Sequence, residues 1–348
     1  MNQVNFKSLM MDLVGNARGR IRLPAPWINE GICFVDVGAR GGPPACWTNF
    51  SSQIYYLCFE PDPVEAEALR RAFSNSQQMR ATVVEAALGS KKNIEELYFT
   101  HYPPSSSFFQ PNFDFLNRLC VGEGFHIEKK ISVELLRLDD VLEQQPERCD
   151  FLKIDVQGYE LEVLQGGIQS LSQAMGCELE VSFREIYKNQ PLFAEVDQWM
   201  RAQGFFLADL ERFWWRRKAM PRSLQERGTL AYGNAVYLKE KIVSPKDLQE
   251  AARSVVICLA LGLDEIAYEV VVETYSKKWI SKEQKDEFEA WIRRHRKPSA
   301  FWFQAGRILK ILPGHRTLGR WLGLWSRALH GNSDTGSDAD SWNRRTSW

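Results

Sequence analysis

The chain has 348 residues, of which 44% are apolar and 25% are charged. Lysine plus arginine and aspartate plus glutamate both number 44, so the formal net charge at pH 7 is zero. This composition excludes a disordered chain, which would be poor in apolar groups, and argues against a generally basic nucleic-acid-binding protein. The length suits one large domain with an extension.

Cysteine usage and hydropathy favour a cytoplasmic protein. The seven cysteines are odd in number, contain no CxxC pair and match no zinc spacing, as expected in a reducing compartment. The apolar run Val255–Leu261 is far shorter than the ~20 residues of a spanning helix. Arg18, Arg20 and Arg22 follow an apolar stretch rather than precede it, unlike a signal peptide. The five histidines form no HxxxH pair, and we expect no metal site.

Hydrophobic periodicity sets out the domains. Apolar residues between 6 and 14 recur at helical spacing, which predicts a helix in an N-terminal segment, 1–30. Short apolar runs then alternate with helical patterns over 31–243, which predicts a doubly wound α/β domain. The predicted strands are Ile32–Val37, Ile54–Phe59, Thr82–Ala87, Phe151–Val156, Leu179–Phe183, Phe205–Leu210 and Ala235–Lys239. The predicted helices are Val64–Phe73, Tyr159–Gln165 and Phe193–Gln203.

An insertion at about 94–138 interrupts this alternation. The strand-like segments Glu95–Thr100 and Ile131–Leu138 bracket Tyr102–Pro111, which is rich in proline and serine. We expect a lid or an extra hairpin here, beside the main sheet.

A helical region follows over 244–330. Ser244 and Pro245 have the residue types of an N-cap and a first helical position. The tail, 331–348, is rich in serine, aspartate, asparagine and glycine, and we expect it to be disordered. The predicted helices of this region are Leu248–Leu261, Leu263–Tyr275 and Lys282–Arg294.

The segment Trp291–Leu329 is basic and rich in tryptophan. It holds nine lysines and arginines, four tryptophans and no acid. A solvated helical face with aromatic packing is the favoured interpretation, because charge runs usually have that role. The alternative is a surface for anionic lipid, which would place the protein peripherally at a membrane or beside a lipid-linked substrate through 291–330.

The first chemical motif is FVDVGARGG, residues 34–42. A strand runs into a glycine turn, and a helix is expected from about Pro43. The N-terminus of such a helix would present free NH groups to polar ligand atoms. The spacing does not fit the G-x-G-x-x-G dinucleotide fingerprint. Asp36, inside the strand, would suit a ligand with a cationic amine.

The second motif, CFEPD at 58–62, ends the next strand. Glu60 lies where an acid can accept both ribose hydroxyls of an adenosine ligand. Asp62 and Glu65 flank a proline in the pattern of a capping box, so we interpret Asp62 as a helix cap.

The third motif is a long segment, 150–167, in which a buried strand leads into a helix. Lys153 and Asp155 lie near the end of the strand, and Gly158 allows the turn. Ligands of open α/β sheets bind outside the carboxyl ends of the strands, which favours a functional role for Asp155. For Lys153, pairing with a neighbouring acid is a sufficient explanation.

Together these motifs resemble the FkbM-type family of S-adenosylmethionine-dependent methyltransferases. FLKIDVQGYELEVLQGG is the most specific segment, whereas VDVG and FEPD are common to class I methyltransferases. The resemblance covers about 32–240 and leaves the helical region outside. Weaker similarities are Ala87–Gly89, Ser105–Ser107, Leu138–Leu142 and Ile186–Phe193.

The resemblance implies a Rossmann-like α/β fold with a mostly parallel seven-stranded sheet and an antiparallel last strand. The α-helical C-terminal extension is predicted from the helical pattern of 244–330. It implies S-adenosylmethionine as cofactor, with its methionine end near Asp36, its ribose on Glu60 and its methyl group near Asp155. The implied cofactor-binding residues are Asp36, Gly38, Ala39, Arg40, Gly41, Glu60, Pro61, Glu85, Ala86, Ala87, Leu88 and Asp155.

Three residues depart from the family pattern. Arg40 stands where a small or polar residue is more usual, Gln157 replaces a common acid, and Asn234 stands where an acid often precedes the last strand. The first could change the geometry of the cofactor loop. The other two argue against an acidic or metal-binding role at their positions.

The implied reaction is O-methylation of a small-molecule or glycan acceptor: a sugar, a glycan precursor or a polyketide-like metabolite. Such an acceptor needs a base, for which Asp155 and His101 are the leading candidates and His126 and Glu180 the others. A divalent cation held by Asp155 and another acid is an alternative to the base. Two other functions stay open: another Rossmann-like nucleotide-cofactor enzyme, and a non-catalytic cofactor-binding module with a partner-recruiting helical region.

Overall fold

The computed structural model describes residue 27 and the ranges 31–74, 79–144, 148–221 and 228–295. They form two compact units. The α/β unit comprises Ile32–Pro43 and Ile54–Ile242, and the helical unit comprises Pro44–Gln53, 243–295 and the described residues up to 31. The helix expected within 1–30, the part of 291–330 beyond 295 and the tail 331–348 lie outside the described residues.

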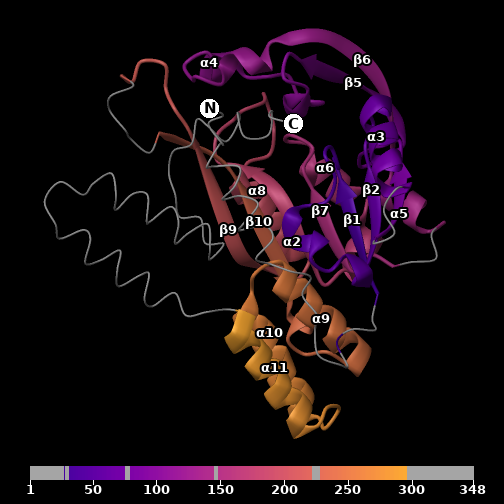
Figure 1. Cartoon of the computed structure of the whole chain (residues 1–348). Coiled ribbons are helices and arrows are strands. Elements are labelled where there is room, and N and C mark those ends of the chain that lie inside the picture. The colour runs from indigo at the N-terminus through magenta and orange to yellow at the C-terminus, as the bar shows by residue number, and fades with distance from the viewer. Residues whose placement is uncertain (1–26, 28–30, 75–78, 145–147, 222–227, 296–348) are drawn as a thin grey trace, which may run out of the picture. The chain divides into compact units, whose positions relative to one another are not determined.

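The α/β unit is built on a seven-stranded sheet with the order β3-β2-β1-β7-β8-β10-β9 (Figure 1). All six residues of β1 are buried, as expected for a parallel strand covered on both faces. Strand β10 runs in the opposite direction to the other six strands of this sheet, which confirms the predicted antiparallel last strand. The strands are β1 (Ile32–Val37), β2 (Ile54–Phe59), β3 (Arg80–Val84), β7 (Phe151–Ile154), β8 (Gly176–Ser182), β9 (Phe205–Trp215) and β10 (Thr229–Lys239).

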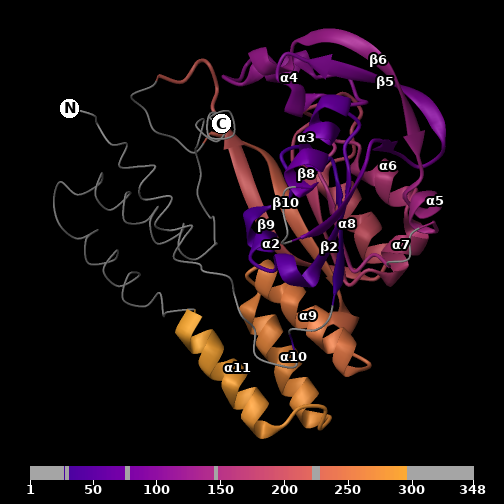
Figure 2. The ribbon, with the colours of Figure 1, turned by 45° about the vertical axis from the view of Figure 1, so that its right-hand side comes forward.

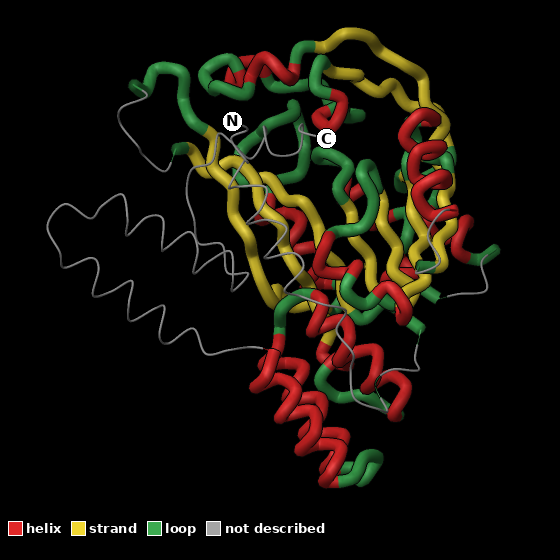
Figure 3. Tube along the Cα trace, viewed as in Figure 1, coloured by secondary structure: helices red, strands yellow, loops and turns green. Residues whose placement is uncertain are grey.

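Helices cover the sheet where the chain crosses between strands (Figure 3). The helices expected at 64–73, 159–165 and 193–203 are confirmed as α3 (Pro63–Ser74), α6 (Glu160–Gln165) and α8 (Phe193–Ala202). The prediction that Leu138 ends a strand is wrong. The strand stops at Leu136, and acids in the first turn favour the start of a helix instead. The additional helices are α4 (Phe113–Leu116), α5 (Leu138–Leu142) and α7 (Ile168–Gln173).

The insertion contributes β5 (Asn93–Thr100) and β6 (Ile127–Leu136) to a second sheet of three strands, in which β6 also pairs with β4 (Ala87–Leu88). Strands β5 and β6 pair antiparallel as a long curved ribbon, so the expected extra hairpin is confirmed (Figure 2). The third main strand ends at Val84 rather than Ala87, because Ala87 and Leu88 pair with β6 instead.

The segment 101–126, between β5 and β6, is anchored to the rest of the α/β unit. Its apolar side chains join a separate core cluster with residues from the 186–187 segment, β9 and β10. Backbone bonds add to this, with the Cys120 NH donating to Arg216 and the Asn112 NH to Ile186. The segment is therefore a fixed part of the unit. The buried members of this cluster are Phe115, Leu116, Leu119, Phe125, Ile186, Tyr187, Trp215 and Ala231.

The helix expected from about Pro43 is the four-residue α2 (Ala45–Thr48). A 3-10 turn at Ser51–Gln53 follows it, and strand β2 begins at Ile54. The anion-binding role expected of its N-terminus therefore loses its basis.

The helical unit contains α9 (Leu248–Ala260), α10 (Asp264–Ser276) and α11 (Lys282–His295), which confirms the three predicted helices. Aromatic packing adds to its core, with the rings of Trp27 and Phe288 5.9 Å apart. None of the helices within the described ranges is both long and apolar enough to cross a membrane.

The predicted N-cap of α9, Ser244, is wrong. The cap is Asp247, whose Oδ1 accepts a hydrogen bond of 2.7 Å from the Glu250 NH. The Glu250 carboxylate in turn accepts from the Lys246 NH at 2.9 Å. This reciprocal arrangement at the helix start outweighs the local signal from Ser244 and Pro245.

Removing the cap tests this assignment. Asp247→Ala should lower the free energy of unfolding by about 1 kcal/mol, since the Glu250 NH loses its acceptor. Ser244→Ala, in the exposed predicted cap, should leave stability unchanged. Urea unfolding of both variants measures the difference, and equal losses would contradict the cap at Asp247.

Candidate functional site

The candidate site lies at the carboxyl ends of β1, β2 and β7. Strand register aligns Val37 with Phe59 on one side and with Ile154 on the other. The residues that follow these three therefore emerge at one edge of the sheet. They include the glycine loop, Glu60 and Asp155, which the sequence motifs singled out.

The glycine loop is joined directly to both neighbouring strands. The NH groups of Gly38 and Ala39 donate to the Phe59 carbonyl at 3.0 and 3.1 Å, and the Asp155 NH donates to Val37 at 3.0 Å. Gly38 has a φ of +80°, and a Cβ there would lie 2.1 Å from the Asp155 carbonyl oxygen. Glycine is required here because the loop crosses the end of β7 at this point.

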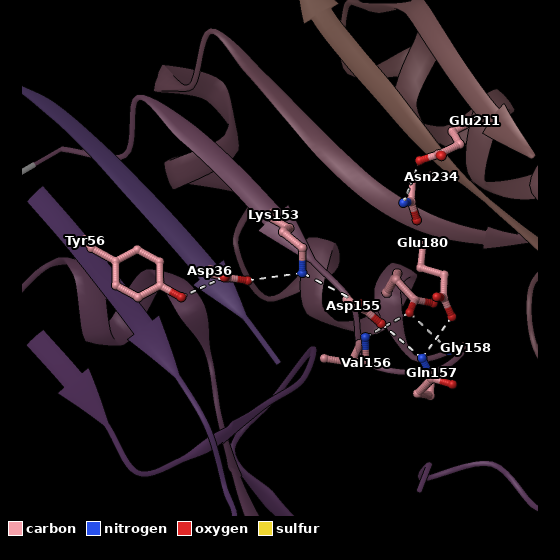
Figure 4. A network of polar contacts seen from close by, with 11 residues as sticks. Asp36, Tyr56, Lys153, Asp155, Val156, Gln157, Gly158, Glu180, Glu211 and Asn234 are labelled. Atoms are coloured by element: carbon pink, nitrogen blue, oxygen red, sulfur yellow. Dashed lines mark hydrogen bonds and ion pairs between the residues drawn. The ribbon is translucent and has the colours of Figure 1, made fainter. Parts of the chain in front are cut away.

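A row of polar side chains runs across β2, β1 and β7 (Figure 4). The Tyr56 hydroxyl donates to Asp36 Oδ2 at 2.7 Å, and Lys153 Nζ donates to Asp36 Oδ1 at 3.3 Å. Lys153 Nζ also lies 3.7 Å from Asp155 Oδ2. The expected pairing of Lys153 with an acid is confirmed. The cation beside Asp36 is therefore the protein's own lysine, whereas the motif suggested a ligand amine.

Burial and neighbouring charges have opposite effects on the pKa values of these side chains. Burial raises the pKa of Asp36, which is 1% exposed, while the Lys153 ammonium acts to lower it. Burial by itself would lower the pKa of Lys153, but the carboxylates of Asp36 and Asp155 raise it overall. We infer that the pair is ionised. The outermost member, Asp155, has a side chain that is 25% exposed, so it is the acid that a ligand can reach.

Glu60 follows β2 and is almost fully buried, at 4% exposure. Burial raises its pKa, and the Asp62 NH acts against this by donating to Oε1 at 2.9 Å. This bond occupies Oε1, so Oε2 can accept a hydrogen bond from a ligand. Next along the chain, Pro61 connects Glu60 to the start of α3.

Arg40 explains one departure from the family pattern. Its guanidinium binds Asp62 at 2.6 Å and Glu65 at 3.0 Å, which ties the glycine loop to the first turn of α3. Asp62 also accepts from the Val64 NH at 3.0 Å, so its prediction as a helix cap is confirmed. The Gly41 position beside Arg40 is open, with no atom within 4 Å of a Cβ placed there.

The segment after β3 offers few side-chain contacts to a ligand. Glu85 is paired with Arg70 at 3.1 Å, and the Ala86 NH donates to Val84. Ala87 and Leu88 are 5% and 3% exposed. Adenine recognition by this segment would therefore rest mainly on its backbone.

The structure does not bring the histidine candidates into the row of polar side chains. His101 is 70% exposed, and its Nδ1 lies 2.8 Å from Glu128 Oε1 on the neighbouring strand of the small sheet. The His126 ring packs against Phe113 at 5.7 Å. In the described part of the chain, no group of three or more His, Cys, Asp or Glu residues could hold a metal ion.

Gln157 contributes more to the site than its sequence suggested. Its Nε2 donates to Asp155 Oδ1 at 3.0 Å and to Glu180 Oε1 at 2.9 Å, and so brings two of the candidate bases together (Figure 4). Nearby on the neighbouring strands, Asn234 Nδ2 donates to Glu211 Oε2 at 3.4 Å. Only the departure from the family pattern distinguished Gln157 in the sequence.

Glu160 is a second residue that the sequence analysis missed. It is 4% exposed, and its Oε1 accepts from the Val156 NH at 3.0 Å and the Gly158 NH at 3.1 Å. This carboxyl holds the turn that carries Gln157. Burial raises the pKa of Glu160 to about 7. An acid at the first helical position after a glycine turn was the available signal.

Comparison with known proteins agrees with this geometry. The chain matches the methyltransferase FkbM domain family over residues 36–207. It is 30% identical over 174 residues to the 2-O-methyltransferase NoeI of Sinorhizobium fredii, which covers 47% of this chain and 69% of NoeI. It is 34% identical over 153 residues to the methyltransferase sdnD of Sordaria araneosa, which covers 38% of this chain and 59% of sdnD.

Among solved structures, the chain is similar to the methyltransferase FkbM of Methylobacillus flagellatus. The TM-score is 0.34 at 15% identity, over 61% of this chain and 48% of the other. It is also similar to the magnesium protoporphyrin IX methyltransferase of Synechocystis, with a TM-score of 0.32 at 13% identity, over 69% and 86% of the two chains.

The sheet order, the reversed β10 and the acids at the carboxyl ends of β1, β2 and β7 define a class I methyltransferase domain. The chain belongs to the FkbM methyltransferase family. Its methyl donor is accordingly S-adenosylmethionine.

The Glu160 carboxyl makes the stability of the fold depend on pH. Because its pKa rises from 4.5 to about 7 on folding, the folded state holds the proton more tightly between these values. The free energy of unfolding should fall across this pH range by up to about 1.4 kcal/mol per unit from this group. Glu160→Gln should remove that slope, and Glu162→Gln on the same helix should retain it. Urea unfolding across the range measures both, and equal slopes would disprove the assignment.

Proposed function

We propose that this chain transfers a methyl group from S-adenosylmethionine to a hydroxyl oxygen of a sugar, a glycan precursor or a polyketide-like metabolite. The family supports methyl transfer, and the relative NoeI, named a 2-O-methyltransferase, supports an oxygen acceptor. The observation that carries the proposal is the position of Glu60 and Asp155 at one edge of the sheet, on either side of the glycine loop.

The residues at this edge fit the adenosyl cofactor. Glu60 is a buried carboxylate with an oxygen still able to accept, which suits the hydroxyl donors of a ribose. Gly41, with a φ of +82°, leaves open space where a ligand can approach the backbone. We therefore assign the methionine end to the loop from Gly38 to Gly41, and the adenine to the backbone of 85–88.

The cofactor, when bound, supplies an activated methyl group on a sulfonium. The protein must align the acceptor and accept its proton. We assign Asp155 as the proton acceptor, because it is the exposed end of the row of polar side chains and directly follows β7 at the edge that carries the glycine loop. His101 is a weaker candidate, because its ring is 70% exposed and lies outside this row of side chains.

A lipid-linked acceptor would give the basic, tryptophan-rich segment a role. Of residues 291–330, the structure describes only 291–295. Contact of this segment with lipid, and a peripheral place at a membrane, therefore stay hypotheses that rest on its charge and tryptophan content.

The ribose assignment predicts a loss of cofactor affinity. Glu60→Gln should weaken binding of S-adenosylhomocysteine by about 10-fold or more, because a hydrogen bond to a charged group contributes about 1.5–3 kcal/mol. Glu67→Gln, an exposed carboxylate further along the adjoining α3, is the matched control and should bind normally. Calorimetry gives both constants, and unchanged affinity for Glu60→Gln would remove the assignment.

The activity itself is tested with the full chain, S-adenosylmethionine and a panel of hydroxylated acceptors. An O-methyl product, identified by mass and by its methoxy carbon signal, is expected. Asp155→Asn should lower kcat by about 100-fold or more, as expected for loss of a base, while leaving affinity for S-adenosylhomocysteine unchanged. Asp114→Asn, at an exposed position, is the control. Cofactor binding without turnover would favour a binding module, and an N-methyl product would overturn the oxygen acceptor.

A further inference from the structure

Gln157 stands where three separated segments of the chain meet. These are the turn after β7, the serine run at 105–107 and the segment around Tyr187. Its φ of +59° lies in the left-handed region, which is unfavourable for a residue with a side chain. Among the described residues, only Asn189 and Lys278 share this conformation without being glycine. Contacts from outside the turn must therefore hold Gln157 in place.

The side-chain amide has one orientation that satisfies its neighbours. Asp155 and Glu180 both lie within 3.0 Å of its Nε2, and ionised carboxylates only accept hydrogen bonds. The NH2 group must face these two acids, so Oε1 faces the Tyr187 hydroxyl at 3.0 Å. That hydroxyl also lies 2.8 Å from the Ser105 carbonyl, which links the amide to the insertion.

The backbone of the turn is held from the same side. Ser107 Oγ donates to the Gln157 carbonyl at 2.7 Å, and Ser107 is 1% exposed. The next residue, Gly158, packs so closely that a Cβ would lie 3.3 Å from both Tyr187 and Gln190. The Gln190 side chain in turn accepts from the Tyr187 NH at 2.6 Å. Gln157 is thus fixed by buried groups at both its backbone and its amide.

We propose that Gln157 is a positioning residue for methyl transfer. Its amide holds the Asp155 and Glu180 carboxylates in one arrangement and couples them, through Tyr187, to the segment 101–126. An acid at this position would place a third carboxylate against two others and remove both donors. A glutamine is therefore what this arrangement requires. The inference rests on the proposed function, because it assigns Asp155 the role of base.

Kinetic variants separate positioning from simple support of the fold. Gln157→Glu should lower kcat by about 100-fold, since small displacements of a reacting group have effects of that order, with little change in KM for S-adenosylmethionine. Tyr187→Phe keeps the ring and removes the hydroxyl, and should lower kcat by about 10-fold. The double variant Gln157→Leu with Tyr187→Phe should be no worse than Gln157→Leu alone, because both act through one amide.

Exchanging the amide and the carboxylate between positions 157 and 180 should restore part of the activity. Combining Gln157→Glu with Glu180→Gln gives positions 155, 157 and 180 one amide and two carboxylates again, as in the parent, and should recover about 10-fold in kcat over Gln157→Glu. Lys278→Gly, at another left-handed position, is the backbone control and should retain full activity. A Gln157→Glu enzyme within about 2-fold of the parent, or a double variant with no recovery, would overturn the proposal.

NMR of the Gln157 side-chain amide tests its contacts without catalytic turnover. The side-chain amide signals of Gln157 in the 15N-labelled chain with S-adenosylhomocysteine can be assigned by their loss in Gln157→Leu. Asp155→Asn, Glu180→Gln and Tyr187→Phe should each shift those signals, and unshifted signals would refute the coupling. If the parent chain methylates no hydroxyl while these shifts occur, the proposed function fails and the coupling stands.

Discussion

The ion pair between Lys153 and Asp36 connects strands β7 and β1 at the edge where the site lies. A buried charge is tolerable only with a partner, and removal of one member of such a pair typically costs roughly 3–5 kcal/mol. Tyr56 completes the coordination of Asp36, and the same lysine faces Asp155. The contact between β1 and β7 at this edge and the placement of the Asp155 carboxylate therefore both depend on the Lys153 ammonium group.

Much of the α/β unit could be predicted because its strands are short, continuous apolar runs. The reversed direction of β10 came from the family resemblance, since periodicity carries no information on direction. Errors arose where two local signals competed. Ser244 and Pro245 resemble a helix start, yet Asp247 with Glu250 satisfies more NH groups and determines the boundary.

The candidate site was predictable where its residues directly follow strands, as Glu60 follows β2 and Asp155 follows β7. Their common edge follows from parallel pairing alone. The role of Gln157 was hidden, because its partners lie up to 50 positions away at Ser107 and no period relates them. His101 was chosen for its place beside a serine-rich run, but its ring faces Glu128 on β6. Side-chain direction at such a strand end depends on tertiary contacts.

The segment 101–126 is anchored to the α/β unit by an apolar cluster of its own, separate from the core of the main sheet. Because this anchoring is already present in the folded chain, a molecule that binds against the segment has no loop to order, and less conformational entropy opposes its binding.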